Sequence, residues 1–582
     1  MPALRAEEGR AAESPFRHLD RAYRALLGRA EGGLSAYSMS SAFFDWATHL
    51  ALSPGRQMEL AWKAVADSQK LLAWAAATLS GEHPGRPPIT PDRRFSSPEW
   101  AKFPFSVLSQ GYLLSEQWWK HAVIGLPGVD AHHTRLVDFY RRQMLDMLSP
   151  SNFLATNPQL LARTKDEGGA NLMRGTQFWA EDLVKRLMNV DEHSIEFTPG
   201  EEVAATPGQV VYHNRLIELI QYAPSTEKVQ PVPVLLVPAW IMKYYILDLT
   251  ATDSLIKWLV DQGFTVFCIS WKNPGPEDRN LGFDDYRKLG VVDALQAVTA
   301  ITGAPKVHGL GYCLGGTLLS VSAAAMARDG DNRLASMTML AAQVDFTEAG
   351  ELSLFTNEDQ LSLLEDMMWE EGVLGKEAMA GTFSMLKSQD LIWSKMVREY
   401  VMGERDLPSP LGAWSEDATR MPFRMHSEYL RWLFLDNDLA EGRMKVGGSQ
   451  IFLQDIKLPV FAVATENDHI APWTSVYKLT WLLRGEVTFA LALGGHNTGI
   501  VAAPGNPRAK HRIMTHTPGR THPGPADWAQ QVPQQPGSWW PAWADWLRAQ
   551  TRGEMVAPPP MGNAEAGYAA RYPAPGKYVM QR

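Results

Sequence analysis

A cysteine between two glycines, in the pattern Gly311-x-Cys313-x-Gly315, combines the residue type and spacing best suited to covalent chemistry in this chain. It lies between a short strand-like run, residues 307–312, and an apolar helical run that follows it. Glycines beside a sharp strand-to-helix turn remove the Cβ atoms that would clash there. A thiol at a helix N-terminus has its thiolate form favoured by the dipole, and a thiolate attacks activated acyl groups strongly. The pattern predicts a nucleophile elbow in which cysteine takes the usual place of serine.

Such a nucleophile needs a base and an acid that orients the base, and after an elbow of this kind they follow in the order nucleophile, acid, histidine. Asp468 comes just after the strand-like run 458–464, and His496 just after the apolar run 487–493. Loops at the carboxyl ends of parallel strands meet at one edge of a sheet, so we expect Cys313, Asp468 and His496 to form a catalytic triad.

The other candidates have a structural interpretation. Cys268 lies inside the apolar run Val-Phe-Cys-Ile-Ser, where a free cysteine behaves as a small hydrophobic residue, and it should be inert. His469 shares the loop of the acid, which favours a loop-shaping role, and His308 lies in the strand that enters the elbow. No cluster of histidine and carboxylate residues has metal-ligand spacing, and no phosphate-binding glycine loop occurs in a suitable context. We therefore expect no metal.

Strand-like and helical runs alternate from about residue 208 onward, which predicts a mostly parallel sheet with helices on both faces. With a nucleophile elbow at the end of one of its strands, such a sheet is typical of an α/β-hydrolase fold, which we expect here. We expect a disordered tail over 1–14, a helical N-terminal region over 15–196 and the catalytic domain over 197–582. A Met-, Trp- and Leu-rich helical stretch at about 345–452 interrupts the alternation, and we interpret it as a cap over the site.

Composition excludes several classes of protein. The net charge of −9 over 582 residues, without a long basic stretch, argues against nucleic acid as a partner. Two cysteines exclude a disulfide framework and fit a reducing compartment, which makes the cytoplasm the expected location. No run reaches the roughly 20 apolar residues that span a bilayer, so we expect no membrane span.

Several motifs along most of the chain resemble those of the poly(3-hydroxyalkanoate) synthases, specifically the class I-like members, which polymerise (R)-3-hydroxyacyl-CoA thioesters into a storage polyester. The matching segments are Asp92-Arg-Arg-Phe95 with Trp100, Tyr112-Leu-Leu114, residues 149–158, 243–249, 270–274, 311–316 and 390–393, Asp468-His469, and Gly537-Ser-Trp-Trp540. The family's catalytic cysteine, acid and histidine correspond to Cys313, Asp468 and His496, the residues chosen above from spacing.

The resemblance implies that His496 deprotonates Cys313, whose thiolate takes the acyl group from CoA as a new thioester. The backbone N–H groups of Leu314 and Ile241 are the expected oxyanion hole, and Arg431, in the segment 430–437, is the expected contact for the CoA phosphates. Trp240 stands where known members carry a small residue, so we expect it to contact substrate. No cofactor is implied beyond the coenzyme A that the substrate carries.

The same resemblance implies a homodimer at the surface of cytoplasmic polyester granules, whose partners are the acyl-CoA and the growing polyester chain. We also expect the enzyme to work without a partner subunit, because it carries a long N-terminal helical region. Two alternatives remain open. One is a thioesterase or lactone hydrolase on the same fold, which the same three residues would serve. The other is a catalytically idle, granule-associated paralogue.

Overall fold

The computed structural model describes residues 15–30, 33–80, 86–188, 197–375, 388–405, 407–519 and 522–582. The tail expected over 1–14 lies outside these residues. Contacts between Cα atoms divide the chain into two compact units. Unit 1 comprises Met1–Gly33, His193–Met379 and Pro408–Arg582, and unit 2 comprises Leu34–Glu192 and Ala380–Leu407.

Unit 1 is built on one sheet whose strands run in the order β14-β13-β12-β11-β6-β5-β3-β4-β2-β1-β17. The six central strands, from β12 to β4, are parallel, and the strands on both flanks are antiparallel. The bounds are β1 Gly208–His213, β2 Ile217–Tyr222, β3 Val234–Val237, β4 Val266–Trp271, β5 Val307–Tyr312, β6 Leu334–Leu340, β11 Val460–Thr465, β12 Val487–Ala492, β13 Lys510–His516, β14 Gln535–Pro536 and β17 Tyr572–Pro573.

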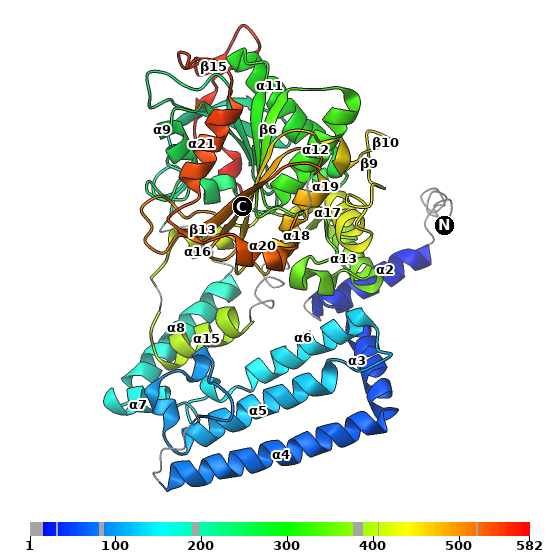
Figure 1. Cartoon of the computed structure of the whole chain (residues 1–582), viewed down its shortest axis with the longest axis vertical. Coiled ribbons are helices and arrows are strands. Elements are labelled where there is room, and N and C mark those ends of the chain that lie inside the picture. The colour runs from blue at the N-terminus through cyan, green and yellow to red at the C-terminus, as the bar shows by residue number, and fades with distance from the viewer. Residues whose placement is uncertain are drawn as a thin grey trace. The chain divides into compact units, whose positions relative to one another are not determined.

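Helices cover both faces of this sheet (Figure 1). Helices α9 (Leu255–Asp261) and α21 (Trp540–Gln550) pack on the face that carries Leu310, and the tryptophans of α21 lie in that core. On the opposite face, α12 (Leu314–Asp329) packs against Gly309 and Met339, while α11 (Asp293–Thr302) also contacts β3 and β5. Alternate residues of a strand point to opposite faces, which explains why β5 offers Leu310 to one layer and glycines to the other. The α/β architecture expected from the sequence is confirmed.

A helical segment follows β6 in unit 1. It includes α13 (Glu358–Glu371), α16 (Pro410–Glu416), α17 (Phe423–Tyr429) and the π-helical turn η10 (Leu430–Leu435). Helix α2 (Pro15–Ala30) packs along α13 and is joined to it by charge. Arg24 pairs with Asp366 at 2.7 Å, and Arg29 pairs with Glu370 at 3.2 Å and with Glu371 at 2.9 Å.

Unit 2 is helical. Its main helices are α3 (Ala36–Ala51), α4 (Pro54–Leu79), α5 (Phe105–Val123), α6 (Ala131–Met147), α7 (Pro158–Asp166) and α8 (Ala170–Met188). The guanidinium of Arg94 ties three segments together, because it pairs with Asp92, with Glu116 of α5 and with Asp146 of α6 at 2.6, 2.9 and 3.4 Å. The Asp-Arg-Arg-Phe motif therefore has a structural role, because it links its own segment to α5 and α6 within this unit.

The segment 388–405 also belongs to unit 2, where η8 (Gln389–Trp393), α15 (Ser394–Met396) and η9 (Val397–Val401) form one helical stretch. Asp182 of α8 accepts hydrogen bonds from Tyr400 at 2.8 Å and from Arg405 at 2.7 Å. A Cβ at Gly175 would lie 2.0 Å from the carbonyl oxygen of Tyr400, so the two backbones touch.

This grouping differs in two places from the boundaries expected from sequence. Helix α2, which we expected in the N-terminal region, packs on α13 in unit 1, because its arginines meet the carboxylates there. The segment 388–405, which we expected in the cap, packs on α8. That the remaining inserted helices cover the site stays a prediction.

Helix α4 carries a row of exposed apolar side chains. Met58, Trp62, Val65, Leu72 and Leu79 are between 54% and 78% exposed. The helical N-terminal region expected from sequence includes this helix, but this face of α4 is not part of the core. Met58, Val65, Leu72 and Leu79 recur every seven residues, so they form one continuous stripe along the helix.

Candidate active site

Cys313 lies at the sharp turn between β5 and α12. Its backbone has φ 52° and ψ −125°, a left-handed region that non-glycine residues rarely adopt. The flanking glycines make the turn possible, since a Cβ at Gly311 would lie 2.2 Å from Gly316 Cα, and one at Gly315 would lie 2.0 Å from the Val237 oxygen. The Cys313 N–H donates to the Leu340 carbonyl at 2.8 Å, which ties the turn to the end of β6. A nucleophile elbow has this geometry.

Asp468 and His496 follow the neighbouring parallel strands β11 and β12, which end side by side at Thr465 and Ala492. His496 Nδ1 lies 2.7 Å from Asp468 Oδ2. The other carboxylate oxygen, Oδ1, accepts the backbone N–H groups of Ile470 at 2.8 Å and Ala471 at 2.9 Å. Both side chains are buried. The acid is therefore held by its own loop and presents one oxygen to the imidazole.

The electrostatics of this pair favour a charged ring. Burial opposes the imidazolium, but the Asp468 carboxylate and the Cys313 sulfur outweigh it and raise the pKa of His496 to about 10. Burial likewise works against the Asp468 carboxylate, yet the imidazolium and the loop N–H groups keep its pKa below the usual value. Because Nδ1 is taken by the acid, Nε2 is the nitrogen left for Cys313. The structure thus brings together the three residues predicted from sequence.

The tip of the histidine loop is held from a second side. The Tyr312 hydroxyl donates to Asn497 Oδ1 at 2.5 Å, and the Tyr312 and His496 rings lie 5.7 Å apart between centroids. Asn497 directly follows His496 in the chain. Sequence reasoning did not assign it a role, since nothing local pairs it with a tyrosine at the end of β5.

The expected oxyanion donors lie on the two segments that flank the elbow. Leu314 is the first residue of α12, so its N–H has no acceptor within the helix. Ile241 lies in the loop after β3, and the close approach of Gly315 to Val237 and Pro238 sets the start of this loop against the elbow. Among the described residues, neither N–H has a recorded protein acceptor.

Trp240 is buried, with 1% of its surface exposed. Its ring centroid lies 5.9 Å from those of Phe283, Tyr286 and Tyr429. Tyr429 is close enough to Cys313 for the sulfur, after the larger effect of burial, to help raise the pKa of the phenol. Trp240 therefore belongs to an aromatic cluster that extends to the nucleophile.

Arg431 is engaged by carboxylates of α13. Its guanidinium contacts Glu365 at 2.8 and 3.0 Å and Glu358 at 2.8 Å. An arginine that binds phosphates from this position would first have to exchange these partners.

Of the three residues given a structural interpretation, His308 and Cys268 are buried and His469 is half-buried. His308 contacts the hydroxyls of Ser336 at 2.7 Å and Thr551 at 3.0 Å, and burial lowers its pKa to about 4. Cys268 is fully buried in β4, where burial raises the pKa of its thiol. Neither is placed to act with the triad.

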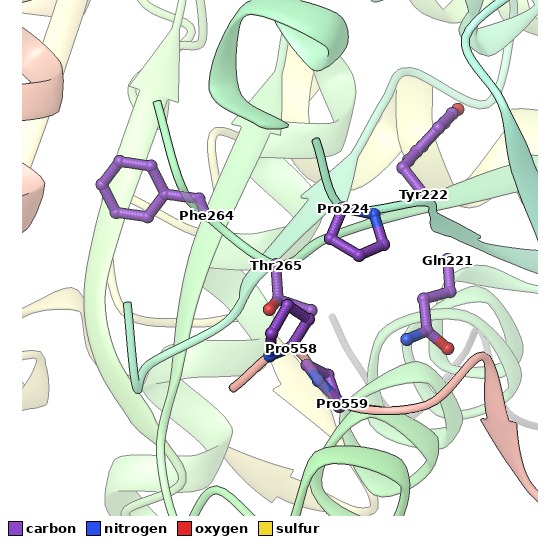
Figure 2. Close-up of a pocket in the computed structure, with 7 residues that line it drawn as sticks. All are labelled: Gln221, Tyr222, Pro224, Phe264, Thr265, Pro558 and Pro559. Atoms are coloured by element: carbon purple, nitrogen blue, oxygen red, sulfur yellow. The ribbon is translucent and has the colours of Figure 1, made fainter. Parts of the chain in front are cut away.

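A narrow surface hollow, without room for an enclosed water molecule, lies elsewhere in unit 1 (Figure 2). Its lining holds no charged side chain and none of the triad; it consists of Gln221, Tyr222, Pro224, Phe264, Thr265, Pro558 and Pro559. The Gln221 side chain of β2 donates to the carbonyl of Pro560 and accepts the N–H of Gly562. The hollow therefore lies where the segment 558–562 is attached to the sheet.

Within the described parts of the chain, no three histidine, cysteine or carboxylate side chains are grouped as a metal site would require. None of the described helices has the length and apolar character needed to cross a bilayer.

Three family models match the chain. The model described as "Poly-beta-hydroxybutyrate polymerase N terminal" matches residues 14–56, and "Poly-beta-hydroxybutyrate polymerase (PhaC) N-terminus" matches residues 91–259. The model described as "alpha/beta hydrolase fold" matches residues 232–503, which agrees with the sheet and elbow of unit 1.

Relatives of known name align with most of the chain. The poly(3-hydroxyalkanoate) polymerase of Methylorubrum extorquens is 44% identical over 503 residues, which cover 85% of this chain and 82% of that protein. The poly(3-hydroxyalkanoate) polymerase subunit PhaC of Rhizobium meliloti is 39% identical, with 84% and 80% coverage. The subunit of the same name from Cupriavidus necator is 36% identical, with 84% and 83% coverage.

Proposed function

The chain belongs to the poly(3-hydroxyalkanoate) polymerase family, and we propose that it polymerises (R)-3-hydroxyacyl-CoA through a thioester on Cys313 with release of CoA. The observation that carries this proposal is the strained cysteine elbow beside a buried His496–Asp468 pair, in a chain that aligns with polymerases over most of its length.

In the first half-reaction, His496 Nε2 already holds the proton of the Cys313 thiol, in keeping with the raised pKa of the ring, and the sulfur attacks the thioester carbonyl of the substrate as a thiolate. The N–H groups of Leu314 and Ile241 stabilise the oxyanion of the tetrahedral intermediate. When that intermediate collapses, the C–S bond to CoA breaks and the CoA thiolate takes the proton from His496. The acyl group is now a thioester of Cys313, close in energy to the one it replaced.

In the second half-reaction, the 3-hydroxyl of a second acyl unit or of the growing chain attacks the Cys313 thioester. His496 accepts the hydroxyl proton, an ester bond forms, and the Cys313 sulfur leaves as a thiolate beside the imidazolium, which restores the resting pair. The carboxylate of Asp468 stabilises the imidazolium in both halves. A thioester keeps the acyl group activated for this transfer, which accounts for cysteine in place of serine.

Arg431 would contact the CoA phosphates. The proposal rests on the matching family segment, and it requires the guanidinium to leave Glu365 when substrate arrives. Trp240, which belongs to the aromatic cluster that reaches Cys313, would limit the space for the side chain of the monomer.

The decisive experiment incubates the purified protein with (R)-3-hydroxybutyryl-CoA, measures free CoA with a thiol reagent and collects insoluble polymer. The Cys313→Ala variant should release no CoA, and Cys268→Ala should behave as the wild type because that thiol is buried. CoA release that yields only free hydroxy acid would establish a thioesterase instead. The absence of CoA release from any tested (R)-3-hydroxyacyl-CoA would indicate an idle paralogue.

We also propose that the enzyme acts alone, as a homodimer, at the polyester surface. The exposed apolar stripe of α4 supports a surface role, because such side chains would lose contact with water against an apolar polymer. Charged substitutions at Trp62 and Leu72 should reduce co-sedimentation with polyester granules and leave CoA release from soluble substrate unchanged. Activity that appears only with a second subunit would refute the first part, and a monomer throughout turnover would refute the second.

A further inference from the structure

The loop that carries Ile241 is held in place by hydrogen bonds that its carbonyl groups accept. The Pro238 carbonyl accepts the indole N–H of Trp271 at 2.9 Å, and the Lys243 carbonyl accepts that of Trp414 at 2.8 Å. Between these two points, the segment that contains Thr419 supplies two further bonds.

Thr419 holds two consecutive peptide groups of this loop. Its hydroxyl donates to the Trp240 carbonyl at 2.6 Å, and its backbone N–H donates to the Ile241 carbonyl at 3.0 Å. Thr419 is fully buried, so water does not compete for either bond. No other described side chain donates to the Trp240 carbonyl.

The Trp240 carbonyl and the Ile241 N–H belong to the same peptide group. A trans peptide is planar, and its C=O and N–H point in opposite directions. A bond that fixes the carbonyl toward Thr419 therefore fixes the N–H toward the other side of the loop. Without that bond, this peptide would be free to rotate about its flanking dihedral angles.

We propose that Thr419 is a positioning residue for catalysis: its hydroxyl orients the Trp240–Ile241 peptide so that the Ile241 N–H serves the oxyanion. This inference rests on the proposed function only for the role of Ile241 as an oxyanion donor. It does not depend on polymerisation or on CoA, because any acylation of Cys313 passes through the same oxyanion.

Thr419→Val tests the hydroxyl alone. Valine has nearly the same shape, and the backbone N–H at position 419 still binds the Ile241 carbonyl, so the loop keeps one of its two tethers. Loss of a complete oxyanion donor costs about 10²- to 10³-fold in rate, and a misoriented donor should cost roughly ten- to a hundredfold. Thr419→Ser keeps the hydroxyl and should remain within about threefold of the wild type. Tyr477→Phe is the matched control, because it also deletes a buried hydroxyl that donates to a main-chain carbonyl, here that of Pro523 at 3.0 Å.

The readout is the burst of nitrophenolate when p-nitrophenyl butyrate acylates Cys313, measured beside alkylation of the same thiol by iodoacetamide. Alkylation needs the nucleophile but no oxyanion hole. We expect Thr419→Val to slow acylation at saturation with little change in the half-saturating ester concentration. Its alkylation rate should remain that of the wild type.

Three results would overturn the inference: unchanged acylation in Thr419→Val, equal loss in Thr419→Ser, or a parallel loss of alkylation that reveals general damage to the site. A wild-type protein that shows no acylation burst although its thiol is alkylated normally would also overturn it. A wild type that is acylated but makes no polymer would refute the proposed function and leave the Thr419 test in force.

Discussion

Replacement of Asp468 by asparagine should separate the fold of the acid loop from its electrostatic role. Asparagine keeps one carbonyl oxygen, which can still accept the N–H groups of Ile470 and Ala471, so the loop can keep its shape. The amide nitrogen then faces His496 Nδ1, and two donors cannot share one hydrogen bond. The ring must present a lone pair at Nδ1 and carry its proton on Nε2, where it can no longer take the proton of Cys313.

The magnitude of the stability change follows from the pKa of His496. The pKa is about 10 in the folded protein against an ordinary value of 6.5. At pH 7 this difference contributes about 4 kcal/mol to the free energy of unfolding, similar to the roughly 3–5 kcal/mol for breaking a buried ion pair. Because the folded pKa is raised, the contribution is fully present below the unfolded pKa and is lost as the pH rises through about 10. The pKa of Asp468 is lowered, so its contribution is lost instead as the pH falls.

The measurement is chemical denaturation of wild type and Asp468→Asn at pH 7 and near pH 10.5, with CoA release assayed at pH 7. We expect a loss of up to about 4 kcal/mol at pH 7, since Asp468 is the larger of the two groups that raise the pKa of His496, and a smaller loss at the higher pH. The turnover number should fall about 10⁴-fold, as when a triad acid is replaced by its amide. Asp261→Asn is the control, since its exposed pair with Lys257 should contribute no more than about 1 kcal/mol. A variant with wild-type stability at pH 7, or with turnover within tenfold, would refute the reasoning.

Four further substitutions test the surroundings of the site. Gly315→Ala should destabilise the protein by about 3 kcal/mol or prevent folding, because the new Cβ would lie 2.0 Å from the Val237 oxygen; circular dichroism and denaturant midpoints check this. Trp240→Ala should cost about 3–5 kcal/mol in the same assay, and a loss below 1 kcal/mol would contradict its role in the aromatic cluster. Glu365→Gln should lower the KM for acyl-CoA by releasing Arg431, whereas Arg431→Gln should raise it roughly tenfold; equal KM values in both variants would dismiss the arginine as a phosphate contact.

The geometry of the triad could be predicted because it depends on local signals. Glycines around Cys313 predict the turn, and strand-like runs before Asp468 and His496 predict that both residues lie at strand ends. Parallel pairing of β11 with β12 then brings the acid and the base together without any further information.

The partners of the inserted segments could not be predicted in the same way. Periodicity shows that α2 and α4 are helices, but it does not show what each apolar or charged face meets. The contact between Thr419 and the Trp240 carbonyl joins residues 179 positions apart, and a threonine in an irregular segment gives no signal of it. The hydrogen bond between Tyr312 and Asn497 could not be predicted either, because the two side chains meet only when β5 and the histidine loop lie at the same edge of the folded sheet.

The chain passes between its two compact units four times, at about residues 33, 192, 379 and 407. Unit 2 is thus held by the peptide chain at both ends of two segments, and no single backbone cleavage between the units can release it. Deletion of residues 34–192 would remove α8 and leave residues 388–405 behind. The side chains of Tyr400 and Arg405, which bind Asp182 of α8 in the intact protein, would then be exposed. A loss of activity after such a truncation could therefore come from the exposed segment 388–405 as well as from the missing helices. A deletion that tests unit 2 alone has to remove both of its chain segments together.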